Sequence, residues 1–239
     1  MKAILFAAGL GTRIQEISKG KPKALVDFNN KTLLEIAIEF LSEKGVEEVI
    51  VNIHHQAELM RDYIYNHVFS IPVSISDESD LLLDTGGGLL KARSFFANET
   101  DFIAFNVDVL SNIDLQKMYK EHVSSEALAT LAVRNRKTSR YLLFNAEDKM
   151  IGWENVNTQE KIIHSNGNYQ QLAFSGIHIL STKIFDLLEQ ENKKVFSITK
   201  SYISLSKNNL IQAYIHDTDF WFDVGKPVSY QEASRYFNI

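Results

Sequence analysis

Two glycines and two cations near the N-terminus form the pattern in this chain that is best suited to bind phosphate. Gly9 and Gly11 follow a short apolar run, Arg13 comes next, and Lys23 stands after Pro22. A glycine loop brings backbone N–H groups close to an anion, because no Cβ stands in the way. Arg13 adds a fork of donors that matches phosphate oxygens, and Lys23 adds a second positive charge. The pattern predicts a polyphosphate-binding loop after a buried strand.

The loop differs from two common phosphate-binding motifs. No Gly-Lys-Ser/Thr follows it, as a Walker A loop requires, and the third glycine of the dinucleotide fingerprint is missing. A pair of glycines after a strand also occurs in ordinary turns, but the two cations at fixed spacing favour a phosphate site.

Two aspartates stand where a sheet would present them to a ligand. Asp108 follows the apolar run at residues 101–107, and Asp223 follows three aromatic residues at 220–222. A buried Asp among aromatic side chains is costly unless its charge is compensated. Mg²⁺ binds proteins through one or two carboxylates together with substrate phosphates. Asp108 could instead cap the next helix, but Asp114 is better placed for that role. We expect a magnesium site at Asp108 and Asp223.

A second glycine loop follows the apolar residues at 81–83. It reads Asp84-Thr85-Gly86-Gly87-Gly88, and Thr85 is predicted to cap a helix that continues to about residue 96. Three consecutive glycines cost backbone entropy, which suggests a close approach of the backbone to another group. A plain tight turn is the alternative.

The elements that must position these residues alternate between strand and helix in the first half of the chain. Such alternation predicts βαβ units and an α/β fold, with a mostly parallel mixed central sheet flanked by helices. Apolar patterns predict the elements below. The strands are expected at residues 3–7, 48–53, 71–76, 101–107, 126–133, 141–144, 150–156, 173–179 and 210–216. The helices are expected at 32–44, 57–65, 85–96, 114–122, 185–191, 197–204 and 227–236, with a surface loop at 157–170.

Composition narrows the class of protein. The chain has 239 residues, no cysteine and a net charge of −5. A disulfide framework and a thiolate metal site are excluded, and mild acidity argues against a nucleic-acid partner. No apolar stretch reaches the ~20 residues that span a bilayer, and no signal peptide is evident. We expect a cytoplasmic protein with no membrane partner.

Five separated segments together resemble the sugar-1-phosphate nucleotidylyltransferases. They are A-A-G-x-G-T-R with P-K, then the T-G-G-G loop, the strand ending at Asp108, F-S-G-I at 174–177, and W-F-D-V-G-K-P at 221–227. The resemblance covers almost the entire chain. It implies a single Rossmann-like, GT-A-like domain over residues 1–239, with an NTP-binding part at about 1–110 and a sugar-binding part at about 111–239.

The resemblance also implies roles for individual residues. Arg13 and Lys23 would be catalytic, and Asp108 and Asp223 would hold Mg²⁺. The residues implied in nucleotide binding are Ala7, Ala8, Gly9, Gly11, Thr12, Arg13, Asn52, Asp84, Thr85 and Gly86. The residues implied in binding the sugar are Asn106, Gly152, Ser175 and Gly176. His178 and His216 are expected to pack or to face solvent, because neither stands in a metal-ligand spacing.

Within the family, the T-G-G-G and F-S-G-I segments resemble uridylyltransferases that act on N-acetylmuramate 1-phosphate. That resemblance implies UTP and N-acetylmuramate 1-phosphate as substrates, a role in peptidoglycan recycling, and a monomer or small homo-oligomer. Residues 52–55 also resemble short mannose-1-phosphate guanylyltransferases, which is the alternative. A non-catalytic nucleotide-sugar sensor and a glycosyltransferase of similar topology are further alternatives. Glu160-Lys161 resembles the family's sugar-phosphate motif without its Pro, and a solvated charge pair explains it as well.

Overall fold

The N-terminal strand lies at the centre of the main sheet. In the computed structural model, which describes residues 1–238, β1 (Lys2–Phe6) pairs in parallel with β4 (Glu48–Ile53) on one side and β6 (Asp101–Asn106) on the other. β5 (Val73–Asp77) pairs in parallel with β4 and forms one end of the sheet. The carboxyl ends of these four strands therefore meet at one edge, which is where ligands bind in open parallel sheets.

The second half of the chain continues the sheet with antiparallel strands. β12 (Gln170–Ser181) pairs with β6, with β8 (Ala129–Arg134) and with β9 (Arg140–Phe144). Its register shifts between Phe174 and His178, around Gly176, so one long strand serves two parts of the sheet. β13 (Ile211–Ile215) pairs with β8, and β10 (Met150–Asn155) and β11 (Glu160–Ile163) complete the far end. The order is β11-β10-β9-β12-β6-β1-β4-β5.

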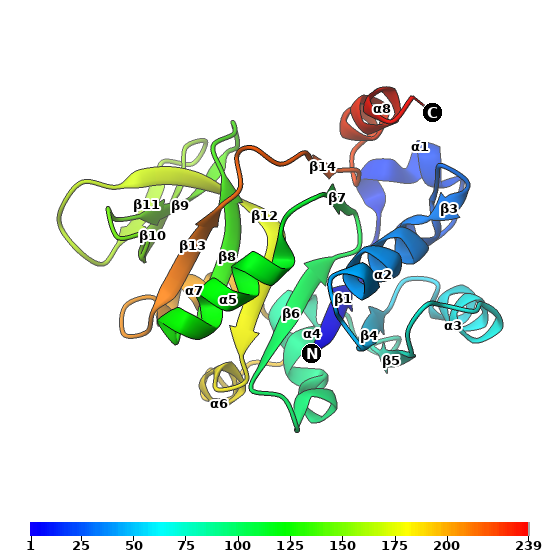
Figure 1. Cartoon of the computed structure of the whole chain (residues 1–239), viewed down its shortest axis with the longest axis horizontal. Coiled ribbons are helices and arrows are strands. Elements are labelled where there is room, and N and C mark those ends of the chain that lie inside the picture. The colour runs from blue at the N-terminus through cyan, green and yellow to red at the C-terminus, as the bar shows by residue number, and fades with distance from the viewer. Residues whose placement is uncertain (239) are drawn as a thin grey trace.

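Helices cover both faces of this sheet (Figure 1). The helices α2 (Leu33–Glu43), α3 (Ala57–Asn66) and α5 (Leu115–Ser125) pack on one face, where alternate residues such as Ala3 and Leu5 are buried. The helices α4 (Asp84–Lys91), α6 (Ile184–Glu189) and α7 (Ile198–Leu205) pack on the other face, against Ile4 and Phe6. Alternate residues of a strand point to opposite faces, so a two-faced core explains the continuous apolar run of β1.

A smaller core lies beside the edge of the sheet that carries the glycine loop. It joins β2 (Asp27–Phe28), the start of α2, β7 (Val109–Ser111), β14 (Trp221–Asp223) and α8 (Pro227–Tyr236). β3 (Lys31–Thr32) pairs with β2. β14 pairs with β7, and α8 lies against β14 near α1 (Gln15–Ser18) in Figure 1. The C-terminal segment is thereby brought next to the N-terminal loop. Short 3-10 helices stand at Thr12–Ile14, Lys23–Leu25 and Arg93–Phe96.

The fold class predicted from the sequence is confirmed, and most elements lie within a few residues of the expected ranges. β4 and α8 have the expected bounds, and Thr32 caps α2 through a capping box with Glu35. Three expectations were wrong in detail. The expected loop at 157–170 contains β11, the strand expected from residue 126 begins at Ala129, and the helix expected to reach 96 ends at Lys91. No helix within residues 1–238 is long and apolar enough to cross a membrane.

Candidate active site

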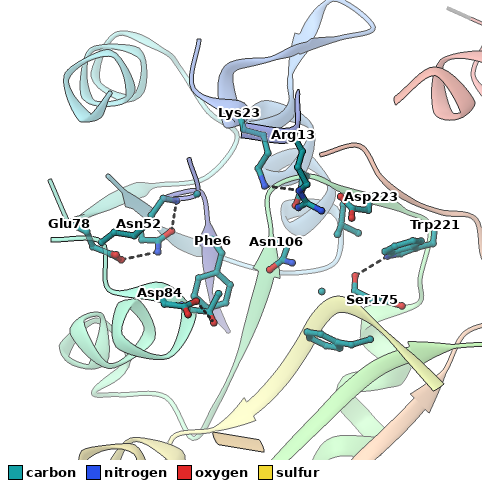
Figure 2. Close-up of a pocket in the computed structure, with 18 of the residues that line it drawn as sticks. Phe6, Arg13, Lys23, Asn52, Glu78, Asp84, Asn106, Ser175, Trp221 and Asp223 are labelled. Carbon is teal, nitrogen blue, oxygen red and sulfur yellow. Dashed lines mark hydrogen bonds and ion pairs between the residues drawn. The ribbon is translucent and has the colours of Figure 1, made fainter. Parts of the chain in front are cut away.

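A cavity of about 500 Å³ opens at the carboxyl edge of the parallel strands (Figure 2). Its walls come from the glycine loop after β1, the ends of β4 and β6, the start of α4, the middle of β12, and β14. The residues predicted from the sequence that line this cavity are Ala8, Gly9, Arg13, Lys23, Asn52, Asp84, Thr85, Asn106, Asp108, Ser175, Gly176 and Asp223. Segments that are distant in the chain therefore meet in one cavity.

The glycine loop is held in place by its neighbour strand. The N–H groups of Ala7 and Ala8 donate to Oδ1 of Asn52 at 2.7 and 3.2 Å. Gly11 has φ +63°, a conformation that favours glycine, and its carbonyl accepts from Ile14 N–H at 3.0 Å. The turn delivers Arg13 toward the cavity, where Figure 2 shows it beside Lys23 and Asp223. Ala7, Gly11 and Thr12 belong to this loop but do not line the cavity.

Lys23 and Asp108 form a buried ion pair at the floor of the cavity. Lys23 Nζ lies 2.8 Å from Oδ2 of Asp108, and both side chains are largely shielded from solvent. Burial opposes ionisation of Asp108, but the Lys23 ammonium outweighs it and holds the pKa of Asp108 below its usual value. Asp108 is therefore an anion in the folded protein.

Asp223 is the second carboxylate of the site. Burial, together with the negative charge of Asp108, raises the pKa of Asp223. The two aspartates are brought together by β14 and β7, and Val224 N–H donates to the carbonyl of Asp108 at 2.9 Å. Gly225 is required here, since a Cβ at that position would lie 2.3 Å from Oδ2 of Asp108. Sequence analysis missed this glycine, although it stands inside the motif that carries Asp223.

This pair of carboxylates fits Mg²⁺. Asp108 is paired with Lys23 at 2.8 Å, whereas the nearest lysine to Asp223, Lys226, is half exposed and lies 4.0 Å away. Burial and the charge of Asp108 raise the pKa of Asp223 although the charge of Arg13 opposes them, so a bound cation would stabilise the ionised pair. Mg²⁺ takes one or two carboxylates and completes its shell with phosphate oxygens and water. No group of three or more His, Cys, Asp or Glu residues within residues 1–238 is arranged to hold a metal ion.

The second glycine loop packs against protein. A Cβ on Gly86 would lie 2.3 Å from the Phe196 ring, and a Cβ on Gly87 would lie 2.2 Å from the carbonyl oxygen of Lys194. These glycines let α4 pack closely against residues 194–196, and Gly86 does not line the cavity. The prediction that Thr85 caps α4 was wrong, because Thr85 Oγ1 accepts instead from Ile198 N–H at 3.0 Å. The chain turns into α4 at Asp84, which has φ +59°.

The opposite wall is built on β12. Gly176 has φ +77°, and a Cβ there would lie 2.6 Å from Nδ2 of Asn106, so the glycine lets Asn106 and β12 meet. Ser175 is buried and its Oγ lies 2.7 Å from Nε2 of His216. Ser175 also accepts, through its carbonyl, from Nε1 of Trp221 at 2.9 Å (Figure 2). A network of hydrogen bonds therefore fixes this wall before any ligand binds.

Arg136 is a further cation of the cavity that sequence analysis missed. Its guanidinium lies over the Trp221 ring, 4.5 Å from the centroid, and donates to the carbonyl of Phe174 at 2.9 Å. Burial lowers the pKa of Arg136, and the Asp223 charge opposes that effect. No motif marks Arg136, because the cluster of arginines from 134 to 140 looks like an ordinary solvated surface.

Other predicted residues lie outside the cavity. Gly152 stands on β10, where a Cβ would lie 2.1 Å from the carbonyl of Ile162, so its absence of a side chain serves strand packing. Lys161 is on the exposed strand β11, where it bonds Tyr169 and lies 3.9 Å from Glu154. Lys161 lines a second groove of about 940 Å³, which adjoins the cavity at Arg136 and Phe174.

The two histidines that were expected to pack or face solvent are buried. His178 Nδ1 lies 2.5 Å from Tyr202 Oη, and burial lowers the pKa of His178 to about 3. Burial likewise lowers the pKa of His216 to about 4. Both are therefore neutral packing residues at pH 7.

Comparison with known proteins identifies relatives of the whole chain. The family model described as "Nucleotidyl transferase" matches residues 2–238. A D-glycero-alpha-D-manno-heptose 1-phosphate guanylyltransferase from Aneurinibacillus thermoaerophilus is 28% identical, over 98% of this chain and 97% of its own length. A probable mannose-1-phosphate guanylyltransferase from rice (Oryza sativa subsp. japonica) is 30% identical, over 99% of this chain and 64% of its own length.

The fold has a close counterpart among solved structures. A UTP-bound UGPase from Acinetobacter baumannii superposes with a TM-score of 0.80, over 99% of this chain and 92% of the other, at 22% identity. At that identity the likeness concerns the fold. It agrees with the α/β architecture described above.

Proposed function

This chain belongs to the nucleotidyl transferase family, and we propose that it transfers a nucleotidyl group from an NTP to a sugar 1-phosphate with release of pyrophosphate. The observation that carries the proposal is the meeting of four groups in one cavity: Arg13, Lys23 and the carboxylates of Asp108 and Asp223. A phosphate-binding loop beside a metal-binding pair is what a reaction between two phosphate substrates requires.

In the proposed reaction a phosphate oxygen of the sugar 1-phosphate attacks the α-phosphorus of the NTP. The bond from that phosphorus to the bridging oxygen of the β-phosphate breaks, and pyrophosphate leaves with the electron pair. The attacking oxygen is already ionised, so no protein nucleophile and no general base is needed. The task of the protein is to align two polyanions and to stabilise the charge that develops between them.

Each charged residue has a proposed part in that task. Arg13 and the loop amides from Gly9 to Thr12 hold the β- and γ-phosphates, and Lys23 neutralises charge where the two substrates meet. Asp108 and Asp223 would hold Mg²⁺, which when bound supplies positive charge to the phosphate oxygens. Arg136, which lies over Trp221 in the cavity wall, would attract the phosphate of the incoming sugar. Asn106, Ser175 and Gly176 form the wall against which the sugar would lie.

For the nucleotide we propose GTP. The two sequence relatives described above are guanylyltransferases, and neither is named for N-acetylmuramate 1-phosphate. The UTP-bound enzyme resembles this chain in fold alone, at 22% identity. Asp84 lines the cavity beside Asn52, and its Oδ1 accepts from Thr85. We infer that its other carboxylate oxygen would accept from the exocyclic amine of guanine, a donor that uracil lacks. By the same relatives, the acceptor would be a hexose or heptose 1-phosphate.

The base preference is tested by kcat/KM for GTP and for UTP with the same sugar 1-phosphate. We expect a ratio well above ten, since a site that hydrogen-bonds one base edge rejects a base lacking it. Asp84→Asn should lower this ratio by impairing GTP alone. A ratio below one would reject GTP and restore the uridylyltransferase assignment that the T-G-G-G segment suggested.

A further inference from the structure

A chain of buried hydrogen bonds joins the glycine loop to the start of α4. It runs from the N–H groups of Ala7 and Ala8 to Oδ1 of Asn52, and from Nδ2 of Asn52 to Oε1 of Glu78 at 2.8 Å. It ends at Leu83 N–H, which donates to Oε2 of Glu78 at 3.1 Å. Asn52 is 3% exposed and Glu78 is 0% exposed. Figure 2 shows Asn52 and Glu78 side by side at the wall of the cavity.

The direction of every bond in this chain is fixed. Two backbone N–H groups face Asn52, so its carbonyl oxygen must point to the loop and its amide nitrogen must point to Glu78. Leu83 offers an N–H from the other side. Glu78 must therefore accept at both of its oxygens, which a carboxylate does and a glutamine cannot, because one of the two amide atoms is a donor.

An ionised carboxylate at the fully buried position of Glu78 has a large desolvation cost. Burial raises the pKa of Glu78, and the hydrogen bonds from Leu83 and Asn52 oppose that effect, with a smaller contribution from the charge of Lys91. A buried carboxylate needs such donors, because its charge is otherwise uncompensated. α4 packs directly on the pair: a Cβ on Gly88 would lie 2.5 Å from Oε1 of Glu78 and 2.9 Å from Nδ2 of Asn52.

We propose that Glu78 is a positioning residue, which through Asn52 and the Leu83 amide holds the phosphate-binding loop and the α4 segment in one fixed arrangement for the nucleotide. The proposal rests on the proposed function, since it takes the loop and α4 to be the two places where the NTP is held. Glu78 is fully shielded from solvent, so it acts through its neighbours. All residues of this hydrogen-bond chain come before residue 110, in the part expected to bind the NTP. We therefore expect changes in it to alter KM for the NTP and to leave KM for the sugar 1-phosphate unchanged.

The test is a double-mutant cycle of Glu78→Gln and Asn52→Asp. Each single variant brings two like groups together. In Glu78→Gln the new amide N–H₂ faces a donor of Asn52 or Leu83, and in Asn52→Asp a carboxylate oxygen faces the carboxylate of Glu78. We expect each to raise KM for the NTP at least about tenfold, the scale of a lost hydrogen bond to a charged group. KM for the sugar 1-phosphate should change less than about twofold.

The double variant reverses one hydrogen bond and satisfies the chain again. The new aspartate accepts from the Ala7 and Ala8 N–H groups and from the new glutamine amide, whose carbonyl accepts from Leu83. The KM of the double variant for the NTP should lie at least about tenfold below the value expected from adding the free-energy effects of the two single variants. Effects within one hydrogen-bond network do not add. Additive effects would overturn the proposal, as would an equal rise in KM for both substrates.

A matched control separates positioning from general loss of stability. His122 is buried in a similar chain, with Thr130 Oγ1 at 2.8 Å and Asp101 Oδ1 at 3.2 Å, at the opposite end of β6. Asp101→Asn should lower the melting temperature and leave both KM values unchanged. If Glu78→Gln does not fold, Asn52→Asp compared with the double variant gives the same answer.

Direct binding keeps this proposal distinct from the proposed function. The Kd of GTP, measured by calorimetry without any sugar phosphate, should follow the same pattern across the four proteins. A wild-type protein that binds GTP but releases no pyrophosphate with any sugar 1-phosphate would reject the proposed function. The pattern of Kd values would still decide the role of Glu78.

Discussion

The two halves of the cavity wall are built in different ways. On the side proposed to bind the nucleotide, parallel strands end in glycine loops, and the polar atoms are mainly backbone groups, cations and the buried pair Asn52 and Glu78. On the side proposed to bind the sugar, antiparallel strands present side chains that are fixed by one another, with neutral buried histidines and an aromatic wall at Trp221. We call these the nucleotide half and the sugar half. A site assembled from backbone loops has little freedom to vary. A wall assembled from side chains can be altered one residue at a time, which would suit its proposed part in selecting the sugar.

Asp108 and Asp223 stand where the two halves meet, so their loss should have the largest effect. Asp108→Asn and Asp223→Asn are each expected to lower kcat by about 10³-fold, comparable to losing a preorganised charge-stabilising group. Removal of metal with a chelator should abolish turnover of the wild type, and added Mg²⁺ should restore it. Circular dichroism would verify that the variants fold. Normal kcat for either variant at limiting Mg²⁺ would contradict the assignment.

The phosphate loop comes next. Arg13→Ala should lower kcat/KM for the NTP by about 10²-fold, since one charge-stabilising donor is lost. Gly11→Val should be worse, because a branched residue at φ +63° is strained and its Cβ would stand 3.4 Å from Cβ of Lys23. Steady-state kinetics with the sugar 1-phosphate held at saturation measure both effects. Near-normal kinetics for Gly11→Val would show that the loop does not cradle phosphates.

Arg136 offers the corresponding test on the sugar side, with a smaller effect. Arg136→Ala should raise KM for the sugar 1-phosphate by about tenfold, the cost of losing one charged hydrogen-bond donor, and should leave KM for the NTP unchanged. Arg140→Ala is the control, since Arg140 is exposed and lines only the adjoining groove. If Arg136→Ala impaired both substrates equally, the contrast between the two halves would fail.

Protonation of the buried histidines should lower stability at acid pH. Because both are neutral at pH 7, their titration should not affect the kinetics at that pH. The pKa of His178 is about 3 and that of His216 about 4, both below the usual 6.5 of the unfolded chain. The unfolded state therefore binds more protons below pH 6.5, and the stability that is complete above 6.5 is lost as pH falls toward 4. Each histidine contributes about 1.4 kcal/mol per pH unit. Burial lowers the pKa of His122 as well, so His178 supplies only part of the slope. Urea unfolding at pH 7, 6 and 5 should show a smaller loss of stability per pH unit for His178→Gln than for the wild type; equal slopes would refute this explanation.

The nucleotide half was largely predictable from the sequence because its signals are local. Gly9, Gly11, Arg13 and Lys23 stand within one short stretch, and the strands that carry them are strongly apolar. The aspartates were found because each follows an apolar or aromatic run. The T-G-G-G loop was recognised, but the reason for its glycines was not, since Phe196 and Lys194 lie more than a hundred residues away in the chain.

The sugar half was harder to predict because its residues meet only in three dimensions. Arg136 is held in the cavity wall by Trp221 and Phe174, and nothing near Arg136 in the sequence indicates either partner. In the other half, Glu78 was missed for the same reason: between Asp77 and Ser79 it looks like an ordinary surface glutamate, and it meets Asn52 and Leu83 only in the folded protein. The packing partner of Gly152 was hidden for the same reason, since Ile162 belongs to a strand that the sequence did not reveal. The part of Gly152 in sugar binding stays a prediction.

The most direct test of the central claim is the stoichiometry of the reaction with both substrates present. Purified protein with Mg²⁺, GTP and a panel of hexose and heptose 1-phosphates should release one pyrophosphate for each nucleotide sugar formed, and none when either substrate is omitted. Mass spectrometry of the products and an enzymatic pyrophosphate assay measure the two quantities. Tight binding of the nucleotide without pyrophosphate release, across the panel and with UTP as well, would contradict the account and identify the protein as a sensor of nucleotides.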